Sequence, residues 1–240
     1  MSIPISLSEN ADTRFNGLKL ITDILIQYLN EDSIYDVTGN KPSTKLINDI
    51  ISKELLPNIK YILSDQEPMP LYGLKLFSII IGKNIGFVTK LKQKKMLGLF
   101  LEYFNSSHPR LTSNTLKIIT RIVECKDVTL DELNSMNFLS KAVNILKHFW
   151  ANNQEWCYEE LLDILHHLLF KIIDVLKSMK IATTTLENTY TPIFISDPKA
   201  IPVLKQNAEF LELLEVFISL SNHVELVNKS LMNLIFLGYR

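Results

Sequence analysis

The chain has 240 residues and a mass of 27.6 kDa, and it is 47% hydrophobic and 21% charged, with only 7 glycines and 9 prolines. This composition excludes disorder as the main state and favours long helices around a large apolar core. The 25 lysines and arginines nearly balance the 26 acidic residues, so the net charge of -1 gives no general attraction to nucleic acid, and we expect no nucleic-acid partner.

The start of the chain and its apolar runs indicate an intracellular protein. Residues 1–10 lack the basic stretch and apolar segment of a secretory signal. The strongest apolar runs, Leu74–Gly82 and Leu231–Gly238, are well short of the roughly 20 residues that span a bilayer. Cys125 and Cys157 lie far apart in apolar contexts, as buried thiols do in a reducing compartment. We therefore expect a cytoplasmic protein without membrane insertion.

The first predicted helix and the loop after it form an N-terminal segment. Apolar residues recur every three or four positions from Phe15 to Tyr28, which predicts one helical face. The stretch Asp32–Pro42 contains a glycine and a proline and ends this pattern. Ser43 then fits the N-cap of a second helix. We accordingly divide the chain into residues 1–42, an N-terminal helix and connecting loop, and residues 43–240, a repeat array.

The rest of the sequence contains four copies of one pattern, which consists of a short apolar helix, a polar turn and a longer apolar helix. The short helices begin at residues 55, 96, 139 and 210, and the first two steps lie within the period of armadillo and HEAT units. The longer third step indicates a loop insertion at about 181–205. Because each helix pair is too small to cover its own apolar face, the pattern predicts an all-α fold, a right-handed α-solenoid or armadillo/HEAT-like superhelix.

Two motifs carry a resemblance to known repeats. The segment Leu55-Leu56-Pro57 to Asp65 looks like the opening of an armadillo repeat, and Leu231-Met232-Asn233-Leu234 looks like its closing Leu-x-Asn-Leu. The run Leu55–Leu76 is similar to the helical-repeat region that lies C-terminal to the kinase domain in Fused/Runkel-type Ser/Thr kinases and pseudokinases. This resemblance implies an accessory scaffold on a larger kinase-like protein linked to microtubules, cytokinesis or cilia.

No catalytic motif is found in the sequence, and we expect neither an enzyme nor a bound cofactor. Glycine-rich phosphate loops and the kinase signature set are absent. The most metal-like segment, Glu159–His167 with its Asp163-x-x-His166 spacing, lacks the second copy that a di-metal bundle needs. The apolar stripe beside it places its polar side chains on the solvated face. A metal- or thiol-dependent enzyme using Cys157 and His166 or His167 stays open as an alternative.

Three groups of residues are candidates for binding a partner protein. Clustered aromatic residues dominate binding hot spots, and a local basic patch suits an acidic partner. Packing between repeats, a solvated helix end and a passive loop are the alternative interpretations. The candidates are Trp150 and Trp156 around one turn, Lys92, Lys94 and Lys95 in the basic run, and Tyr190 and Phe194 in the insertion.

Taken together, these patterns predict a non-catalytic protein–protein interaction scaffold with cytoskeletal or kinase-associated partners. It would be the regulatory or targeting region of the larger kinase, in the cytoplasm or at the cytoskeleton or cilium. A free-standing adaptor subunit is the alternative. The last predicted helix, Leu231–Leu237, lacks the polar outer face of a terminal repeat. We therefore expect either a longer protein or self-association through this helix.

Overall fold

The protein is helical in both of its compact units, Met1–Phe100 and Leu101–Arg240, in the computed structural model. Among the described residues, one pair of short strands, β1 (Thr183–Thr184) and β2 (Phe194–Ile195), forms an antiparallel bridge. The predicted all-α class is confirmed. The structure describes residues 10–30, 49–84 and 86–152, and further on residues 157, 160, 161, 163–165, 167, 168, 170, 171, 174, 183, 184, 194 and 195.

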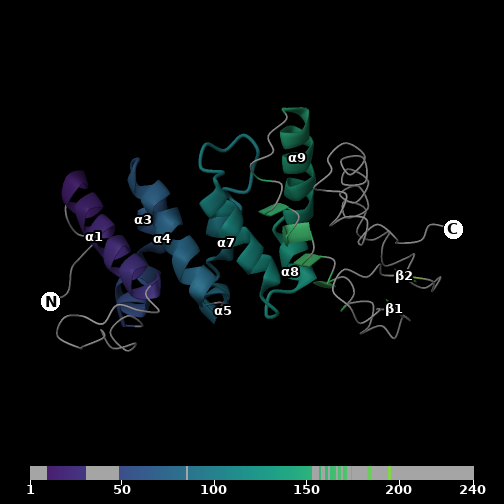
Figure 1. Ribbon diagram of the computed structural model, residues 1–240, viewed down its shortest axis with the longest axis horizontal. Coiled ribbons are helices and arrows are strands. Elements are labelled where there is room, and N and C mark those ends of the chain that lie inside the picture. The colour runs from purple at the N-terminus through teal and green to yellow at the C-terminus, as the bar shows by residue number, and fades with distance from the viewer. Residues whose placement is uncertain are drawn as a thin grey trace. The chain divides into compact units, whose positions relative to one another are not determined.

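The first unit is built around one apolar helix, α4. Figure 1 shows α4 with α1 and α3 beside it, and both helices pack against it. Leu74 and Phe77 of α4 are fully buried, and the Phe77 ring meets Phe100 edge-on at 5.6 Å. The described helices of this unit include α1 (Ala11–Asn30), the π-helical η1 (Ile50–Leu55), α3 (Leu56–Ser64), α4 (Met69–Lys83), α5 (Gly86–Gln93) and the start of α6 (Leu97–Leu101).

The entry into α3 differs from the prediction of two separate helices. η1 runs directly into α3 without a break. At the junction the N–H of Leu56 donates to the carbonyl of Ile51, five residues back, as in a π-helix. Pro57 follows in the first turn of α3, where a residue without an N–H is tolerated. The proline thus marks a change of helix type within a continuous helical segment.

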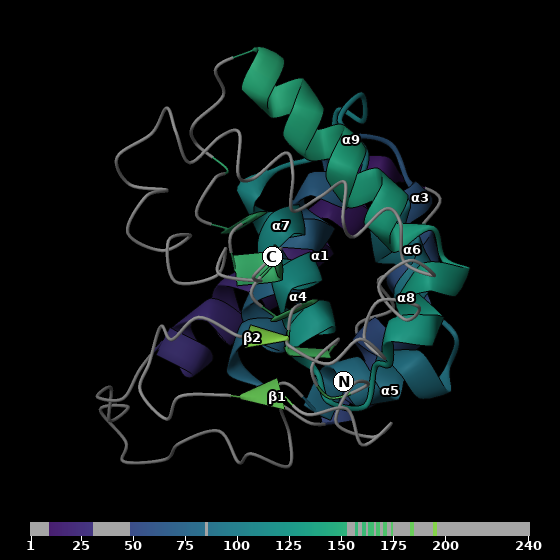
Figure 2. The same cartoon turned by 90° about the vertical axis from the view of Figure 1, so that its right-hand side faces the viewer.

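The second unit contains a short helix that apolar periodicity did not predict. This helix, α8 (Leu130–Ser135), begins with a capping box in which Thr129 and Glu132 bond each other's backbone N–H groups. Asn137, between α8 and α9, has a left-handed conformation (φ 54°), and Figure 2 shows α8 beside the lower end of α9. The other described helices of this unit are α7 (Ser113–Glu124) and α9 (Phe138–Ala151).

Buried aromatic rings and a strongly amphipathic helix form the core of the second unit. The rings of Phe104 and Phe138 stack with centroids 5.0 Å apart and an interplanar angle of 13°. Along α7, Leu116, Ile119 and Val123 are fully buried at helical spacing. In the core stripe predicted for the next helix, Leu161, Ile164, Leu165 and Leu168 are buried as expected, and Ile172 lies outside the described residues.

Polar contacts in the second unit join residues that are about one repeat apart. Ser113 Oγ donates to Glu160 Oε1 at 2.9 Å across 47 residues. Lys171 Nζ donates to the carbonyls of Cys125 and Val128 at 2.8 and 2.5 Å, across 46 and 43 residues. The helical residues from 160 to 171 therefore follow α7 in the same direction. The period predicted from the sequence reappears as contacts between successive repeats.

One of these contacts corrects the prediction for the segment Glu159–His167. Glu160 was expected on the solvated face, but its side chain is half-buried and bonded to Ser113. The reason is that α7 begins beside it, which a helical wheel of one segment cannot show. Asp163 is exposed as expected.

Other predicted features lie outside the described residues. They include the fourth repeat from residue 210 onward, with its final helix Leu231–Leu237, and Ser43 with most of the second helix. In the described part of the chain, no single helix is long and apolar enough to cross a bilayer. α4 and α5 reach that length and apolar content only as a pair, with a bend of 119° between them.

The contact between α3 and α4 yields a test of the fold. A Cβ at Gly73 would lie 2.5 Å from Cγ2 of Ile62. We expect Gly73→Ala to lower the free energy of unfolding by about 1–2 kcal/mol, because overpacking outweighs the helix propensity of alanine. Urea denaturation measures this.

Gly82 supplies the matched control in the same helix. It is exposed, and a Cβ there would meet nothing within 4 Å. Gly82→Ala should therefore raise stability, by up to about 1 kcal/mol. A Gly73→Ala variant as stable as Gly82→Ala would contradict the close packing of α3 on α4.

Candidate functional site

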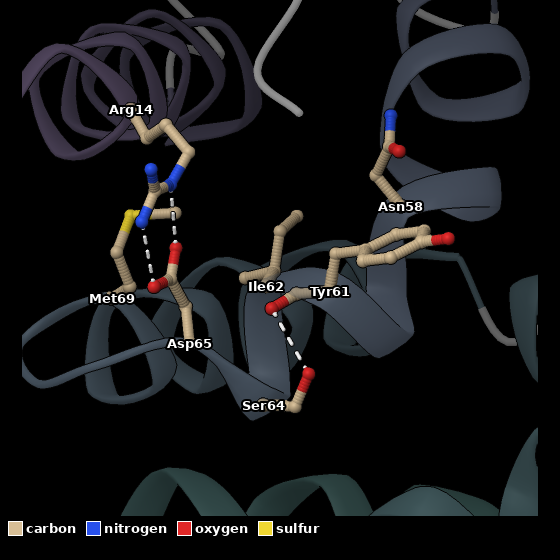
Figure 3. Close-up of a pocket in the computed structure, with 7 residues that line it drawn as sticks. All are labelled: Arg14, Asn58, Tyr61, Ile62, Ser64, Asp65 and Met69. Carbon is tan, nitrogen blue, oxygen red and sulfur yellow. Dashed lines mark hydrogen bonds and ion pairs between the residues drawn. The ribbon is translucent and has the colours of Figure 1, made fainter. Parts of the chain in front are cut away.

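A polar-rimmed pocket of about 300 Å³ opens in the first unit, between α1, α3 and the start of α4 (Figure 3). Its apolar side is formed by Ile62 and Met69, which are 1% and 3% exposed. We call this pocket the notch. It is lined by Arg14, Asn58, Tyr61, Ile62, Ser64, Asp65 and Met69.

An ion pair forms one wall of the notch. Arg14 Nε and Nη2 donate to the two carboxylate oxygens of Asp65 at 2.8 and 2.9 Å, and Figure 3 shows the two groups face to face. The carboxylate also accepts the N–H of Gln66 at 2.8 Å. The bond from Arg14 lowers the pKa of Asp65, and the same bond raises the pKa of Arg14. This two-pronged pair ties α1 to the turn between α3 and α4.

The residues that carry the family resemblance are those that hold α1, α3 and α4 together. Asp65 takes the ion pair, and Gly73 allows the approach of Ile62. Tyr72 lies edge-on against Phe15 of α1, with ring centroids 4.9 Å apart. The motif therefore encodes the packing of α1, α3 and α4 on one another.

The open rim of the notch is suited to binding. The side chain of Tyr61 is 68% exposed, which is unusual for a large aromatic residue. Asn58 of the same helix donates its amide N–H to the carbonyl of Glu54 at 2.7 Å. An exposed aromatic ring next to an apolar floor and a polar wall is typical of a protein-docking site.

Sequence reasoning missed most of the notch. Arg14 and Asp65 are 51 residues apart, so no local pattern links them. The available signal was the position of Tyr61 on α3, because Tyr61 lies outside the apolar face that Ile59, Ile62 and Leu63 form.

The predicted lysine run lies at the C-terminal end of α5, where two backbone hydrogen bonds cap the helix. The N–H of Met96 donates to the carbonyl of Leu91 at 2.9 Å, and that of Lys95 to the carbonyl of Lys92 at 2.8 Å. Lys95 has a φ of 55°, so this is a Schellman motif with a lysine where glycine is usual. Lys94 and Lys95 are exposed, and Lys92 is half-buried.

The predicted aromatic candidates are mostly outside the part that the structure describes. Trp150 lies near the end of α9, but its side chain is not among the described ones, and Trp156 and Tyr190 are not described. Phe194 pairs with Thr184 through its backbone in the β bridge. The role of these residues in partner binding stays a prediction.

The thiol predicted as an alternative nucleophile is fully buried. Burial raises the pKa of Cys157 to about 12. A nucleophilic cysteine needs a lowered pKa and access to its substrate, and Cys157 has neither. Among the described residues, no group of three or more His, Cys, Asp and Glu side chains could hold a metal ion. His166 lies outside the described residues.

Comparison with known proteins identifies the type of repeat. Residues 2–89 match the profile of the HEAT repeats of serine/threonine-protein kinase ULK4-like proteins. Serine/threonine-protein kinase ULK4 of Mus musculus is 25% identical over 145 residues, which cover 58% of this chain and 11% of that protein. No solved structure matches the chain. Over residues 2–89 the chain therefore resembles the HEAT repeats of ULK4-like kinases. The resemblance to a helical-repeat region of Ser/Thr kinases, which Leu55–Leu76 predicted, is confirmed.

The ion pair in the notch predicts a pH-dependent effect of Asp65→Asn. Because the pKa of Asp65 is lowered in the folded state, the pair stabilises the fold above the unfolded-state pKa of about 4 and loses this effect as the pH falls through the folded-state pKa. We expect the variant to have a lower Tm than the wild type at pH 7, and the gap to narrow below about pH 4.

Asp163→Asn is the control, since Asp163 is exposed. Its Tm should stay close to that of the wild type at both pH values. An Asp65→Asn gap that does not change with pH would contradict the role of the carboxylate charge.

The Schellman motif predicts a stabilising substitution. Lys95→Gly should raise the free energy of unfolding by about 0.5–1 kcal/mol, because glycine adopts the left-handed conformation without strain. Lys94→Gly, one residue earlier, should give no gain. Thermal unfolding of both variants measures the difference, and equal effects would argue against the left-handed cap.

Proposed function

We propose that this chain is a non-catalytic protein-binding scaffold. It is the regulatory or targeting region of a larger kinase-like polypeptide. In the cytoplasm, it links that polypeptide to microtubules or cilia. The observation that carries the proposal is the HEAT-type repeat match over residues 2–89, the segment that forms the notch. HEAT repeats stack into extended surfaces that bind other proteins.

The lengths of the two proteins support a module of a larger polypeptide. The chain spans about a tenth of one curated relative that it matches, 11% of the length of serine/threonine-protein kinase ULK4 of Mus musculus. That relative is named as a kinase, while the present sequence carries no kinase signature. The kinase-like domain of the proposed polypeptide would lie outside this sequence.

The buried state of Cys157 favours a scaffold over the thiol-dependent alternative. Because burial raises the pKa of Cys157, its thiol is essentially un-ionised at pH 7, even before access is considered. Buried in this way, the residue serves the core of the second unit.

The size of the native polypeptide tests the link to a kinase. An antibody against this chain should detect an endogenous polypeptide much larger than 27.6 kDa, and its peptides should include kinase-like sequence by mass spectrometry. A band at 27.6 kDa would contradict the link and favour the free-standing adaptor.

Sedimentation with microtubules tests the proposed target and the notch together. We expect the purified chain to pellet with stabilised microtubules, and Tyr61→Ala to weaken this binding about 5- to 30-fold, as loss of an aromatic hot spot does. Leu20→Ala is the control, because Leu20 is 53% exposed on α1 and does not line the notch. Absence of the wild-type chain from the pellet would contradict the microtubule proposal.

A further inference from the structure

Charge is unevenly distributed along this nearly neutral chain. The segment from Pro68 to Leu101, which covers α4, α5 and α6, contains no aspartate or glutamate. Its charged residues are Lys75, Lys83, Lys90, Lys92, Lys94 and Lys95. Acidic residues outnumber basic ones on both sides of the segment, so it forms a local positive region.

Three of these lysines gather at the exposed end of α5. Lys90, Lys94 and Lys95 are exposed, whereas Phe87 and Leu91 of the same helix are buried. Lys90 and Lys94 are four residues apart and so share one face of the helical turn. We call Lys90, Lys94 and Lys95 the lysine turn.

The backbone of the lysine turn is held in place before any partner arrives. Its two cap bonds, Met96 to Leu91 and Lys95 to Lys92, satisfy two of the carbonyls at the helix end. These carbonyls would otherwise present partial negative charge to an approaching acidic group. The backbone that carries the three lysines is therefore ordered before binding, which reduces the conformational entropy lost when a partner binds.

Among the described residues, no carboxylate forms an ion pair with a side chain of the lysine turn. Within the described residues, Arg14, Lys53 and Arg121 each form an ion pair with a carboxylate. No such pair joins Lys90, Lys94 or Lys95 to an acidic side chain in the same part of the chain.

We propose that the lysine turn docks an acidic segment of a partner protein, a run of glutamates or aspartates. This inference deepens the scaffold function proposed above and rests on it. Lysine ammonium groups act as point charges that pair with carboxylates in many geometries. The chain has no arginine between Arg14 and Arg110, so the turn lacks the fork that favours phosphate. It also lacks the exposed aromatic rings on which bases stack, which disfavours RNA.

The test uses a fluorescent ten-residue glutamate peptide and the whole purified chain. We expect saturable binding by fluorescence anisotropy that weakens as salt is added. The triple variant Lys90→Gln, Lys94→Gln, Lys95→Gln should bind about tenfold more weakly, since each exposed charge pair contributes a small part of the affinity. Far-ultraviolet circular dichroism of each variant confirms that it is folded.

A charge-matched variant is the control. Lys19, Lys117 and Lys126 are exposed on other parts of the two units, and changing all three to glutamine removes the same charge. This control should bind the peptide within about twofold of the wild type, since only the general field changes.

Three results would overturn the inference. The first is that the wild-type chain does not bind the glutamate peptide. The second is that both triple variants lose the same affinity for this peptide. The third is that a ten-nucleotide uridine RNA binds more tightly than the peptide and depends on the same lysines. Failure here differs from failure of the proposed function, because microtubule sedimentation through the notch is measured separately with Tyr61→Ala.

Discussion

The constraint on which this structure depends is that no helix pair can bury its own apolar surface. α4 is apolar on several sides, and α1 and α3 are the helices that cover most of it. In the second unit, Lys171 reaches back across 46 residues to the carbonyl of Cys125 at the end of α7. Such a contact satisfies a carbonyl at a helix end and fixes the register of two repeats at once. Stability therefore arises from interactions between neighbouring repeats.

This constraint also decides which residues are available for function. Cys157, which the sequence offered as a candidate catalytic group, is buried and serves the core. The described residues outside the core include the Tyr61 rim of the notch and the lysine turn. One offers an aromatic ring beside an apolar floor, and the other offers unneutralised charge. Both are features of binding surfaces, which agrees with a scaffold.

Periodicity predicted those features of the fold that depend on local pattern. The apolar phase of α1, α4 and α7 and the repeat step follow from residues three, four and about 43 positions apart. The notch could not be predicted in this way, because Arg14 meets Asp65 only after α1 packs on α4. Helix α8 was missed because its signal is a capping box at Thr129 and Glu132, in a helix too short for an apolar repeat. The lysine run was visible in the sequence, but its left-handed cap at Lys95 was not.

Hydrogen exchange of a Lys171→Met variant tests the coupling between neighbouring repeats most directly. The substitution keeps an apolar stem but removes the bonds to the carbonyls of Cys125 and Val128. We predict that amides in the last turn of α7 and in the helical residues from 160 to 171 exchange at least about tenfold faster, while those of α1, α3 and α4 do not change. Unchanged exchange at the end of α7, or equal acceleration throughout the chain, would contradict the account.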